Sequence, residues 1–272
     1  MTSASIPDDD VRWGGELLAR GARDLPGLKY SYLASHLPPR GRVLEVGSGE
    51  GKLLRSLHRD APELELFGCD VRSPATSPDG YEFSIAEGGL PYPSASFDAV
   101  IVADVLEHVP DPEHTLLEIA RILAPGGRLV AFVPVEGEPL SLYSAYRVLL
   151  GPDLYLRTKE HVQAFRHAHL RAMVSAHFET ADWRYAYHAL GHAFDASFFA
   201  VARLPRIREF WWKENKYYRG EQEVGALARA LNRLLELGNR IAYYESVLLA
   251  RTRICAAGVL FDVRKRNSSV VA

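Results

Sequence analysis

A short apolar strand that runs into a glycine-rich turn is the feature that most constrains this chain. Residues 42–46 read Arg-Val-Leu-Glu-Val and lead directly into residues 47–51, Gly-Ser-Gly-Glu-Gly. Glycine lets the backbone approach a ligand closely, because no Cβ atom stands in the way. Residues 52–59 carry leucines at helical spacing, so the turn opens a helix whose first N–H groups are free. The pattern predicts a ligand-binding turn between a buried strand and a helix.

An acid at the end of the next strand narrows the kind of ligand. Residues 64–71 read as a second strand, with Asp70 near its carboxyl end. A carboxylate there can accept hydrogen bonds from the hydroxyls of a ribose. The glycine spacing differs from the Gly-x-Gly-x-x-Gly of dinucleotide-binding turns, and Glu45 would repel a pyrophosphate but suit a cationic ligand. The combination disfavours a dinucleotide and is compatible with a cationic ligand, whereas Glu45 could also orient the glycine backbone and the glycines could form no more than a tight strand-to-helix turn.

Strands and helices continue to alternate after Asp70. Residues 97–103 are almost wholly apolar, which is typical of a strand covered on both faces. Asp111 is an N-cap followed by Pro112, and the helix that they start ends at residues 125–127, Pro-Gly-Gly. Residues 128–135 form the next expected strand. Short connections between such elements predict a parallel sheet with crossover helices.

The second half of the chain has a looser pattern. Residues 140–178 look mostly helical, and strands are expected at 180–188 and 258–264. We therefore expect an N-terminal arm and helix in 1–40, an α/β core in 41–190, a helical insert in 191–253, and the last strand with a tail in 254–272.

Composition excludes several classes of protein. Of 272 residues, 47% are hydrophobic and 24% are charged, and the formal net charge is −2, so we expect a globular protein and no nucleic-acid partner. Cys69 and Cys255 form no disulfide framework. From the sequence we expect neither a signal peptide nor a membrane-spanning segment, and the expected location is the cytoplasm.

Five segments together resemble the motifs of class I S-adenosylmethionine (SAM)-dependent methyltransferases, most similarly the type 11, ubiquinone/menaquinone-biosynthesis-like group. They are residues 45–51, 90–93 (Leu-Pro-Tyr-Pro), 96–98 (Ser-Phe-Asp), 105–109 (Val-Leu-Glu-His-Val) and 123–127 (Leu-Ala-Pro-Gly-Gly). The resemblance implies a Rossmann-like, doubly wound, mostly parallel seven-stranded α/β sheet with a helical insert before the last strand. It also implies a small-molecule methyltransferase with SAM as cofactor.

By this resemblance, the glycine turn lies beneath the methionine part of SAM, Asp70 holds the ribose and Val71 lies against the adenine. The family commonly has an acid near position 86, where this chain has Ala86, and Glu87 is the nearest substitute. The expected cofactor-binding residues are Glu45, Gly47, Ser48, Gly49, Gly51, Asp70, Val71, Glu87 and Asp104.

Residues for the acceptor side are harder to choose, because SAM carries most of the reactivity and the protein chiefly aligns the reactants. His108 is the candidate general base and Glu107 a second candidate, and either residue would alternatively only shape the pocket. Tyr30, His161 and His188 are candidate substrate contacts. His188 and His192 have the spacing of two ligands on a helix, but no His-Glu-x-x-His pattern accompanies them, so no metal site is expected.

The insert carries aromatic and basic residues in one stretch. The aromatic residues include Phe194, Phe198 and Phe199, residues 210–212 (Phe-Trp-Trp) and residues 217–218 (Tyr-Tyr), and basic residues from Arg203 to Arg219 lie among them. Such a segment can form a lid for an apolar or anionic substrate, rest on a membrane surface, or simply fill a helical cap. A leucine-rich stripe in 226–245 predicts a helix with one buried face.

Two other functions stay open from sequence alone. One is an NAD(P)-dependent oxidoreductase, which the glycine spacing and Glu45 disfavour. The other is a non-catalytic relative that binds a cofactor or a partner. The sequence does not define the oligomeric state or the methyl acceptor.

Overall fold

The computed structural model describes residues 18–75, 77–139, 161–193 and 226–266, together with Ser141, Ser144 and Val148. These residues form a seven-stranded sheet in the order β3-β2-β1-β4-β5-β7-β6. β7 runs antiparallel to both β5 and β6, and the remaining strand pairs are parallel. The strands are β1 (Gly41–Val46), β2 (Leu64–Asp70), β3 (Glu82–Ile85), β4 (Phe97–Ala103), β5 (Leu123–Pro134), β6 (Phe178–Ala186) and β7 (Gly258–Lys265). The predicted mostly parallel, doubly wound sheet is confirmed.

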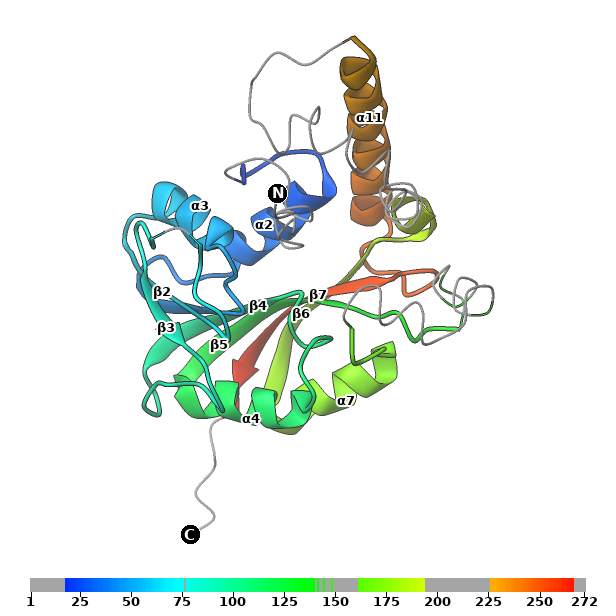
Figure 1. Ribbon diagram of the computed structural model, residues 1–272. Coiled ribbons are helices and arrows are strands. Elements are labelled where there is room, and N and C mark those ends of the chain that lie inside the picture. The colour runs from blue at the N-terminus through cyan, green and yellow to red at the C-terminus, as the bar shows by residue number, and fades with distance from the viewer. Residues whose placement is uncertain are drawn as a thin grey trace, which may run out of the picture.

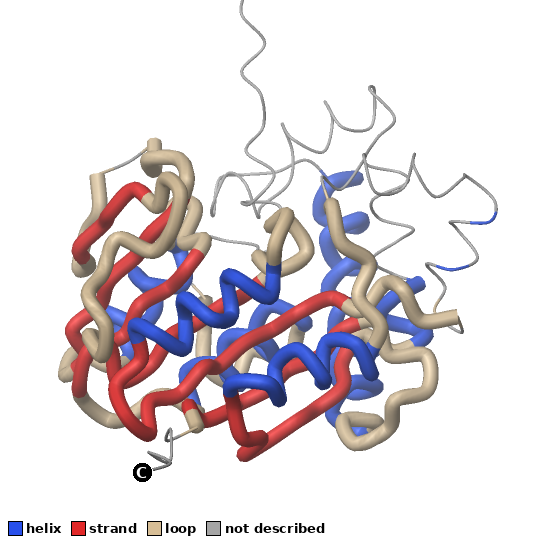
Figure 2. Tube along the Cα trace, turned by 90° about the horizontal axis from the view of Figure 1, so that it is seen from below, coloured by secondary structure: helices blue, strands red, loops and turns tan. Residues whose placement is uncertain are grey.

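Helices cover both faces of the sheet (Figure 1). α2 (Leu25–Ser35) and α3 (Lys52–Asp60) lie on one face, and α4 (Pro112–Ile122) and α7 (His167–His177) on the other. Figure 2 views the sheet from below and shows α4 and α7 lying across the strands on this face. The sheet is therefore the middle layer of three.

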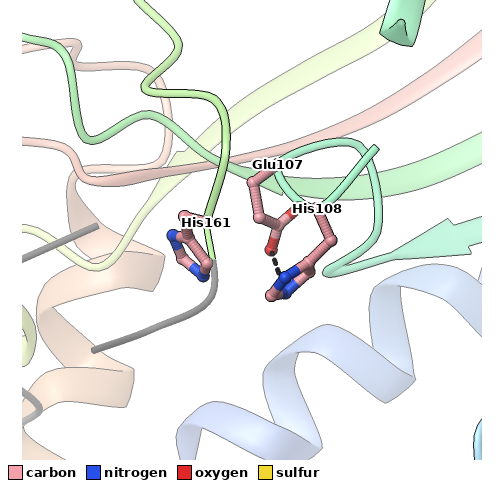
Figure 3. A group of neighbouring side chains, drawn as sticks. All are labelled: Glu107, His108 and His161. Carbon is pink, nitrogen blue, oxygen red and sulfur yellow. Dashed lines mark ion pairs between the residues drawn. The ribbon is translucent and has the colours of Figure 1, made fainter. Parts of the chain in front are cut away.

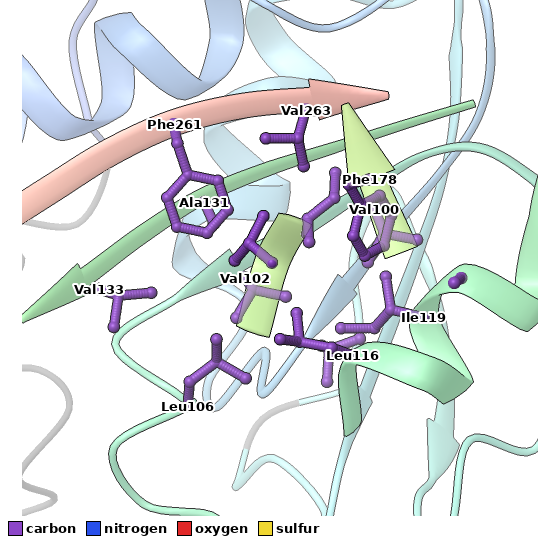
Figure 4. Packing of buried hydrophobic residues seen from close by; sticks show 14 of the residues in the cluster. Val100, Val102, Leu106, Leu116, Ile119, Ala131, Val133, Phe178, Phe261 and Val263 are labelled. Carbon is purple, nitrogen blue, oxygen red and sulfur yellow. The ribbon is translucent and has the colours of Figure 1, made fainter. Parts of the chain in front are cut away.

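β4 is almost wholly apolar because both of its faces are covered. Val100 and Val102 belong to the core beneath α4 and α7, whereas Ala99 and Ile101 face the core beneath α2 and α3. Figure 4 shows the first of these cores, where Val100 and Val102 pack with Leu116 of α4. Successive side chains of a strand point to opposite faces, so a strand covered on both faces buries side chains on each of them, and here only Asp98 near the start of β4 is exposed.

Helix caps agree with the sequence. The Asp111 side chain accepts a hydrogen bond from the His114 N–H at 2.9 Å, as an N-cap residue should. A second cap was not expected: the Asp24 side chain accepts from the Gly27 N–H at 2.7 Å. α2 therefore begins at Leu25, within the N-terminal segment 1–40 for which the sequence predicts a helix.

Three strands differ from the sequence-based expectation by more than one residue at an end, and the smallest of these differences is at β6, which spans Phe178–Ala186 instead of 180–188. β5 begins at Leu123 instead of Arg128, because Leu123 already pairs with Phe97 before the strand register shifts. β3 was not predicted. It has four residues, pairs with β2 alone and exposes Glu82 and Ile85, so it carries little hydrophobic pattern.

The helix predicted in the insert is present as α11 (Ala226–Leu248), which stands away from the end of the sheet in Figure 1. Its expected buried stripe is wrong at Leu234 and Ile241, which are 64% and 46% exposed. Packing against the core occurs near Ala242, whose side chain would contact a Cβ added at Gly191. The aromatic and basic stretch falls in residues 194–225, outside the described residues, and the division of the chain into four segments stays a prediction.

No helix within the described ranges is both long and apolar enough to cross a bilayer.

The order of the strands places a binding site. β1 is an interior strand, with β2 and β3 on one side and β4, β5, β7 and β6 on the other, so the strand order reverses between β1 and β4. Ligands of open α/β sheets bind beyond the carboxyl ends of the strands at such a reversal. The glycine turn follows β1 at this place.

Candidate active site

The glycine turn has a backbone that only glycine adopts without strain. Gly47, Gly49 and Gly51 have φ angles of +72°, +48° and +72°, in the left-handed region. The N–H groups of Gly47 and Ser48 donate to the Cys69 carbonyl at 2.8 and 3.1 Å, which ties the turn to the end of β2. Gly51 is the N-cap of α3 and provides no side-chain cap. The turn is thus a fixed loop that opens a helix.

Asp70 lies beside this turn, at the last position of β2. Its Oδ2 accepts a hydrogen bond from the Gly49 N–H at 2.9 Å, and its Oδ1 accepts from the Arg72 N–H at 3.2 Å. The structure therefore brings together the acid and the glycines that the sequence predicts as one site. Val71 is 66% exposed next to it, and Glu87 is exposed just after β3.

Glu45 lies beneath the turn and is buried. Burial raises the pKa of its carboxyl well above the ordinary value of 4.5, and the negative charge of Asp70 raises it further. Its Oε2 has no hydrogen-bond partner among the described residues. A buried carboxylate is costly unless it is paired, so this position favours either the protonated acid or a cationic ligand above it.

Asp104 follows β4 and pairs with a residue that sequence reasoning missed. Lys29 of α2 places its Nζ 2.6 Å from Asp104 Oδ2, and the same Nζ lies 4.2 Å from the centre of the Phe132 ring. Lys29 is buried, although lysine is rarely buried, so nothing in the sequence around it indicates a place in the site. The ion pair fixes α2 over the carboxyl end of β4.

Three of the candidate acceptor-side residues meet beyond the ends of β4 and β5 (Figure 3). His108 Nε2 lies 3.8 Å from Glu107 Oε1, and the rings of His108 and His161 meet edge to face with centroids 4.7 Å apart. His161 Nδ1 lies 2.9 Å from Oε2 of Glu136, which was not predicted. Glu136 follows β5 as Asp104 follows β4, so its position at a strand end was the signal that could have found it.

The acceptor-side cluster, which we define as Glu107, His108, Glu136 and His161, adjoins the glycine turn. Val105, in the loop that carries Glu107 and His108, packs so closely on Gly47 that a Cβ there would lie 2.4 Å from Val105 Cγ2. Contact between these two loops requires glycine at position 47. The structure therefore joins the expected cofactor side and the acceptor side at one point.

Tyr30 and His188 lie elsewhere. The Tyr30 ring is fully buried in the core under α2 and α3, and its hydroxyl donates to Asp60 at 2.6 Å. His188 is also fully buried, with Nε2 2.8 Å from the Thr252 carbonyl oxygen. Their substrate-binding roles stay predictions, and this burial does not favour them.

Comparisons with known proteins agree with the motifs. Residues 18–196 match the model of a methyltransferase domain family. The chain is 32% identical over 159 residues to the demethylmenaquinone methyltransferase of Thermus thermophilus, spanning 50% of this chain and 72% of that protein. It is 31% identical over 185 residues to the ubiquinone biosynthesis O-methyltransferase of Xylella fastidiosa, spanning 58% and 72%.

A solved structure of a phosphoethanolamine N-methyltransferase 2 from Haemonchus contortus, in complex with S-adenosylhomocysteine, is similar with a TM-score of 0.54. The identity is 15%, and the match covers 88% of this chain and 52% of that one, so this likeness shows the fold alone. The family match covers most of the chain, and the chain therefore belongs to the methyltransferase-domain family. It is a SAM-dependent methyltransferase.

Proposed function

We propose that this enzyme methylates an oxygen, nitrogen or carbon atom of a small, apolar or anionic metabolite, with a quinone precursor as the first candidate. The observation that carries the proposal is the junction of the glycine turn with the acceptor-side cluster through Gly47 and Val105. The names of the relatives from Thermus thermophilus and Xylella fastidiosa support a quinone precursor.

The cofactor side fits SAM by its chemistry. When bound, SAM supplies an activated methyl group on a positively charged sulfur. The backbone of Gly47 and Gly49 would pass beneath it, and Asp70 would accept hydrogen bonds from the ribose hydroxyls. Glu45, buried below the turn with an unpartnered Oε2 among the described residues, suits a ligand of positive charge. Ser48, Gly51, Val71, Glu87 and Asp104 complete the proposed cofactor site.

The acceptor side offers side chains that can act on a proton. Glu107, Glu136 and His161 are almost fully buried, whereas the His108 side chain is 31% exposed. An acceptor can therefore reach His108 first, and a neutral imidazole can take the proton of a hydroxyl or amine. The carboxyl of Glu107 lies next to it, with Oε1 3.8 Å from His108 Nε2.

A combined binding and turnover experiment tests this proposal. The purified protein is titrated calorimetrically with SAM, S-adenosylhomocysteine and NADH, and is then assayed for transfer of labelled methyl groups to hydroxylated quinone precursors and to amines. We expect binding of the two adenosyl ligands, no binding of NADH, and transfer to a quinone precursor. Adenosyl binding without transfer to any acceptor would favour a non-catalytic relative, and binding of NADH alone would favour an oxidoreductase.

The remaining predictions concern the surroundings of the site. We propose that residues 191–253 form a lid over the acceptor, and a membrane surface is the other partner that their composition suggests. We expect no nucleic-acid partner and a cytoplasmic location. Exchange of basic residues such as Arg206 and Arg208 for glutamine should change the KM for an anionic acceptor and leave the affinity for SAM unchanged.

A further inference from the structure

Three metal-ligating side chains converge on the acceptor side. Glu107, His108 and His161 each place one donor atom within 4.8 Å of the other two (Figure 3). They come from two segments that backbone hydrogen bonds hold together, because the N–H groups of Val162 and Gln163 donate to the Glu107 carbonyl at 2.9 and 3.1 Å. The arrangement is thus anchored by the backbone on both sides.

His161 has the orientation of a metal ligand with outer-shell support. Its Nδ1 lies 2.9 Å from Glu136 Oε2, and the side chains of both residues are only 2% exposed. A carboxylate at Nδ1 holds the ring proton there and leaves the lone pair on Nε2, as in the carboxylate–histidine–metal arrangement. Nε2 is buried and has no hydrogen-bond partner in the part of the chain that the structure describes. An acceptor atom left in this way is costly, and a cation would satisfy it.

We propose that Glu107, His108 and His161 bind a divalent transition-metal ion, with Glu136 positioning His161. Two imidazoles and one carboxylate are a ligand set of catalytic zinc sites, which keep a further position open. Metal–ligand bonds of about 2.1 Å in a tetrahedron place donor atoms about 3.4 Å apart. The pair of His108 Nε2 and Glu107 Oε1, at 3.8 Å, is already close to this separation.

The open position of the metal site would face the acceptor. His108 is the only one of the three ligands with substantial exposure, so a molecule from solvent reaches the ion from the His108 side. An oxygen or nitrogen atom of the acceptor would complete the coordination, and His108 would then serve as a ligand instead of taking the proton. This use in catalysis rests on the proposed function, whereas metal binding does not. The proposed metal site differs from the expectation from sequence, which was that the chain has no metal site.

Zinc binding to the full chain tests the proposal directly. Protein freed of metal with a chelator is titrated calorimetrically with Zn²⁺, and Co²⁺ is added separately so that its visible absorption reports the coordination. We expect a single tight Zn²⁺ per chain. His161→Ala should weaken binding by more than about 100-fold, and Glu136→Gln by about 10–100-fold as an outer-shell partner. His114→Ala, at an exposed histidine of α4, is the matched control and should leave binding unchanged.

Two results would overturn the site: wild-type protein that takes up no stoichiometric Zn²⁺, or equal Zn²⁺ affinity in His161→Ala and His114→Ala. Circular dichroism and S-adenosylhomocysteine affinity are measured on the same samples. If His161→Ala fails to fold, Glu136→Gln decides, because it keeps the shape of the side chain. Wild-type protein that binds Zn²⁺ but does not bind S-adenosylhomocysteine would contradict the proposed function without contradicting the metal site.

Discussion

The candidate site has a cofactor side and an acceptor side, and the two sides present different chemical groups. On the cofactor side, the turn after β1 presents backbone and glycine, and Asp70 is the partly exposed acid beside it. On the acceptor side, the loops after β4 and β5 and the segment before α7 present carboxylates and imidazoles. The first half comes from one strand-turn-helix-strand unit, whereas the second is assembled from three separate segments.

This difference teaches where function is free to vary. A loop made of glycine recognises its ligand through shape and backbone N–H groups, so it suits a constant cofactor. A cluster of titratable side chains recognises through charge and proton affinity, and its members can change with the acceptor. We therefore expect substitutions on the acceptor side to change turnover, and substitutions on the cofactor side to change binding or stability.

The sharpest test of this division is His108→Ala. If His108 activates the acceptor as proposed, its loss should lower kcat by roughly 10²–10⁴-fold, the usual contribution of a positioned acid or base. The affinity for S-adenosylhomocysteine should stay nearly unchanged, because no atom of the glycine turn is altered. Steady-state kinetics with the identified acceptor and calorimetry give both quantities. His114→Ala serves as control, and equal turnover of the two variants would remove His108 from the mechanism.

The junction between the halves should be sensitive to a single methyl group. Gly47→Ala adds a Cβ at a φ of +72° and within 2.4 Å of Val105 Cγ2. The strained backbone and the overlap together should lower the free energy of unfolding by about 2–5 kcal/mol. Denaturant unfolding measures this loss, and adenosyl affinity should fall with it.

Two further variants separate the causes. Gly126→Ala has a φ of +74° but open space around its new Cβ, so it reports the backbone strain alone. Adding Val105→Ala to Gly47→Ala should recover the overlap part of the loss and leave the strain. If Gly47→Ala is no worse than Gly126→Ala, the close contact between the two halves does not constrain position 47.

The same contrast explains what the sequence could predict. Residues 41–70 fold into strand, turn, helix and strand by local pattern, and Asp70 needs only parallel pairing of β1 with β2 to meet the turn. The meeting of Glu107 with His161 depends on hydrogen bonds from Val162 and Gln163, between segments far apart in the chain. No periodicity or motif encodes such a contact.

Burial of charged groups was equally hidden. Local pattern offers no reason to place Lys29 inside, because its burial requires Asp104 and the ring of Phe132 to be assembled around it. The exposure of Leu234 on α11 is the converse case, where an apolar stripe has no core beneath part of its length. Both outcomes are set by tertiary packing, which local composition does not determine.

Asp70→Ala tests how much a side chain contributes to ligand binding on the cofactor side. Removing charge-assisted hydrogen bonds to the ribose should weaken binding of S-adenosylhomocysteine by about 1.5–3 kcal/mol. The Gly49 N–H also loses its acceptor, so part of the effect passes through the turn. Calorimetry of this variant is compared with Asp79→Ala, an exposed acid in the loop after β2. Unchanged affinity in folded Asp70→Ala would contradict the proposed cofactor site.

The smallest expected effect is a pH dependence that belongs to Glu45. Because burial raises the pKa of Glu45 in the folded chain, the folded state keeps this proton at pH values where the unfolded state has lost it. The contribution of Glu45 to wild-type stability should therefore fall as the pH rises above the ordinary value of 4.5, with a slope that approaches about 1.4 kcal/mol per pH unit. Glu45→Gln carries no titrating proton and should lack this decline.

Urea unfolding of wild type, Glu45→Gln and the exposed control Glu63→Gln across this pH range isolates the contribution of Glu45. The plots of stability against pH for Glu45→Gln and Glu63→Gln differ only if the buried carboxyl of Glu45 resists ionisation. Coincident plots would show that it does not. Saturating SAM should reduce the decline in wild type, since a positive charge above Glu45 favours its ionised form. A decline that SAM leaves unaltered would place the sulfonium away from Glu45, so the acid beneath the turn would support the loop without sensing the charge of the ligand.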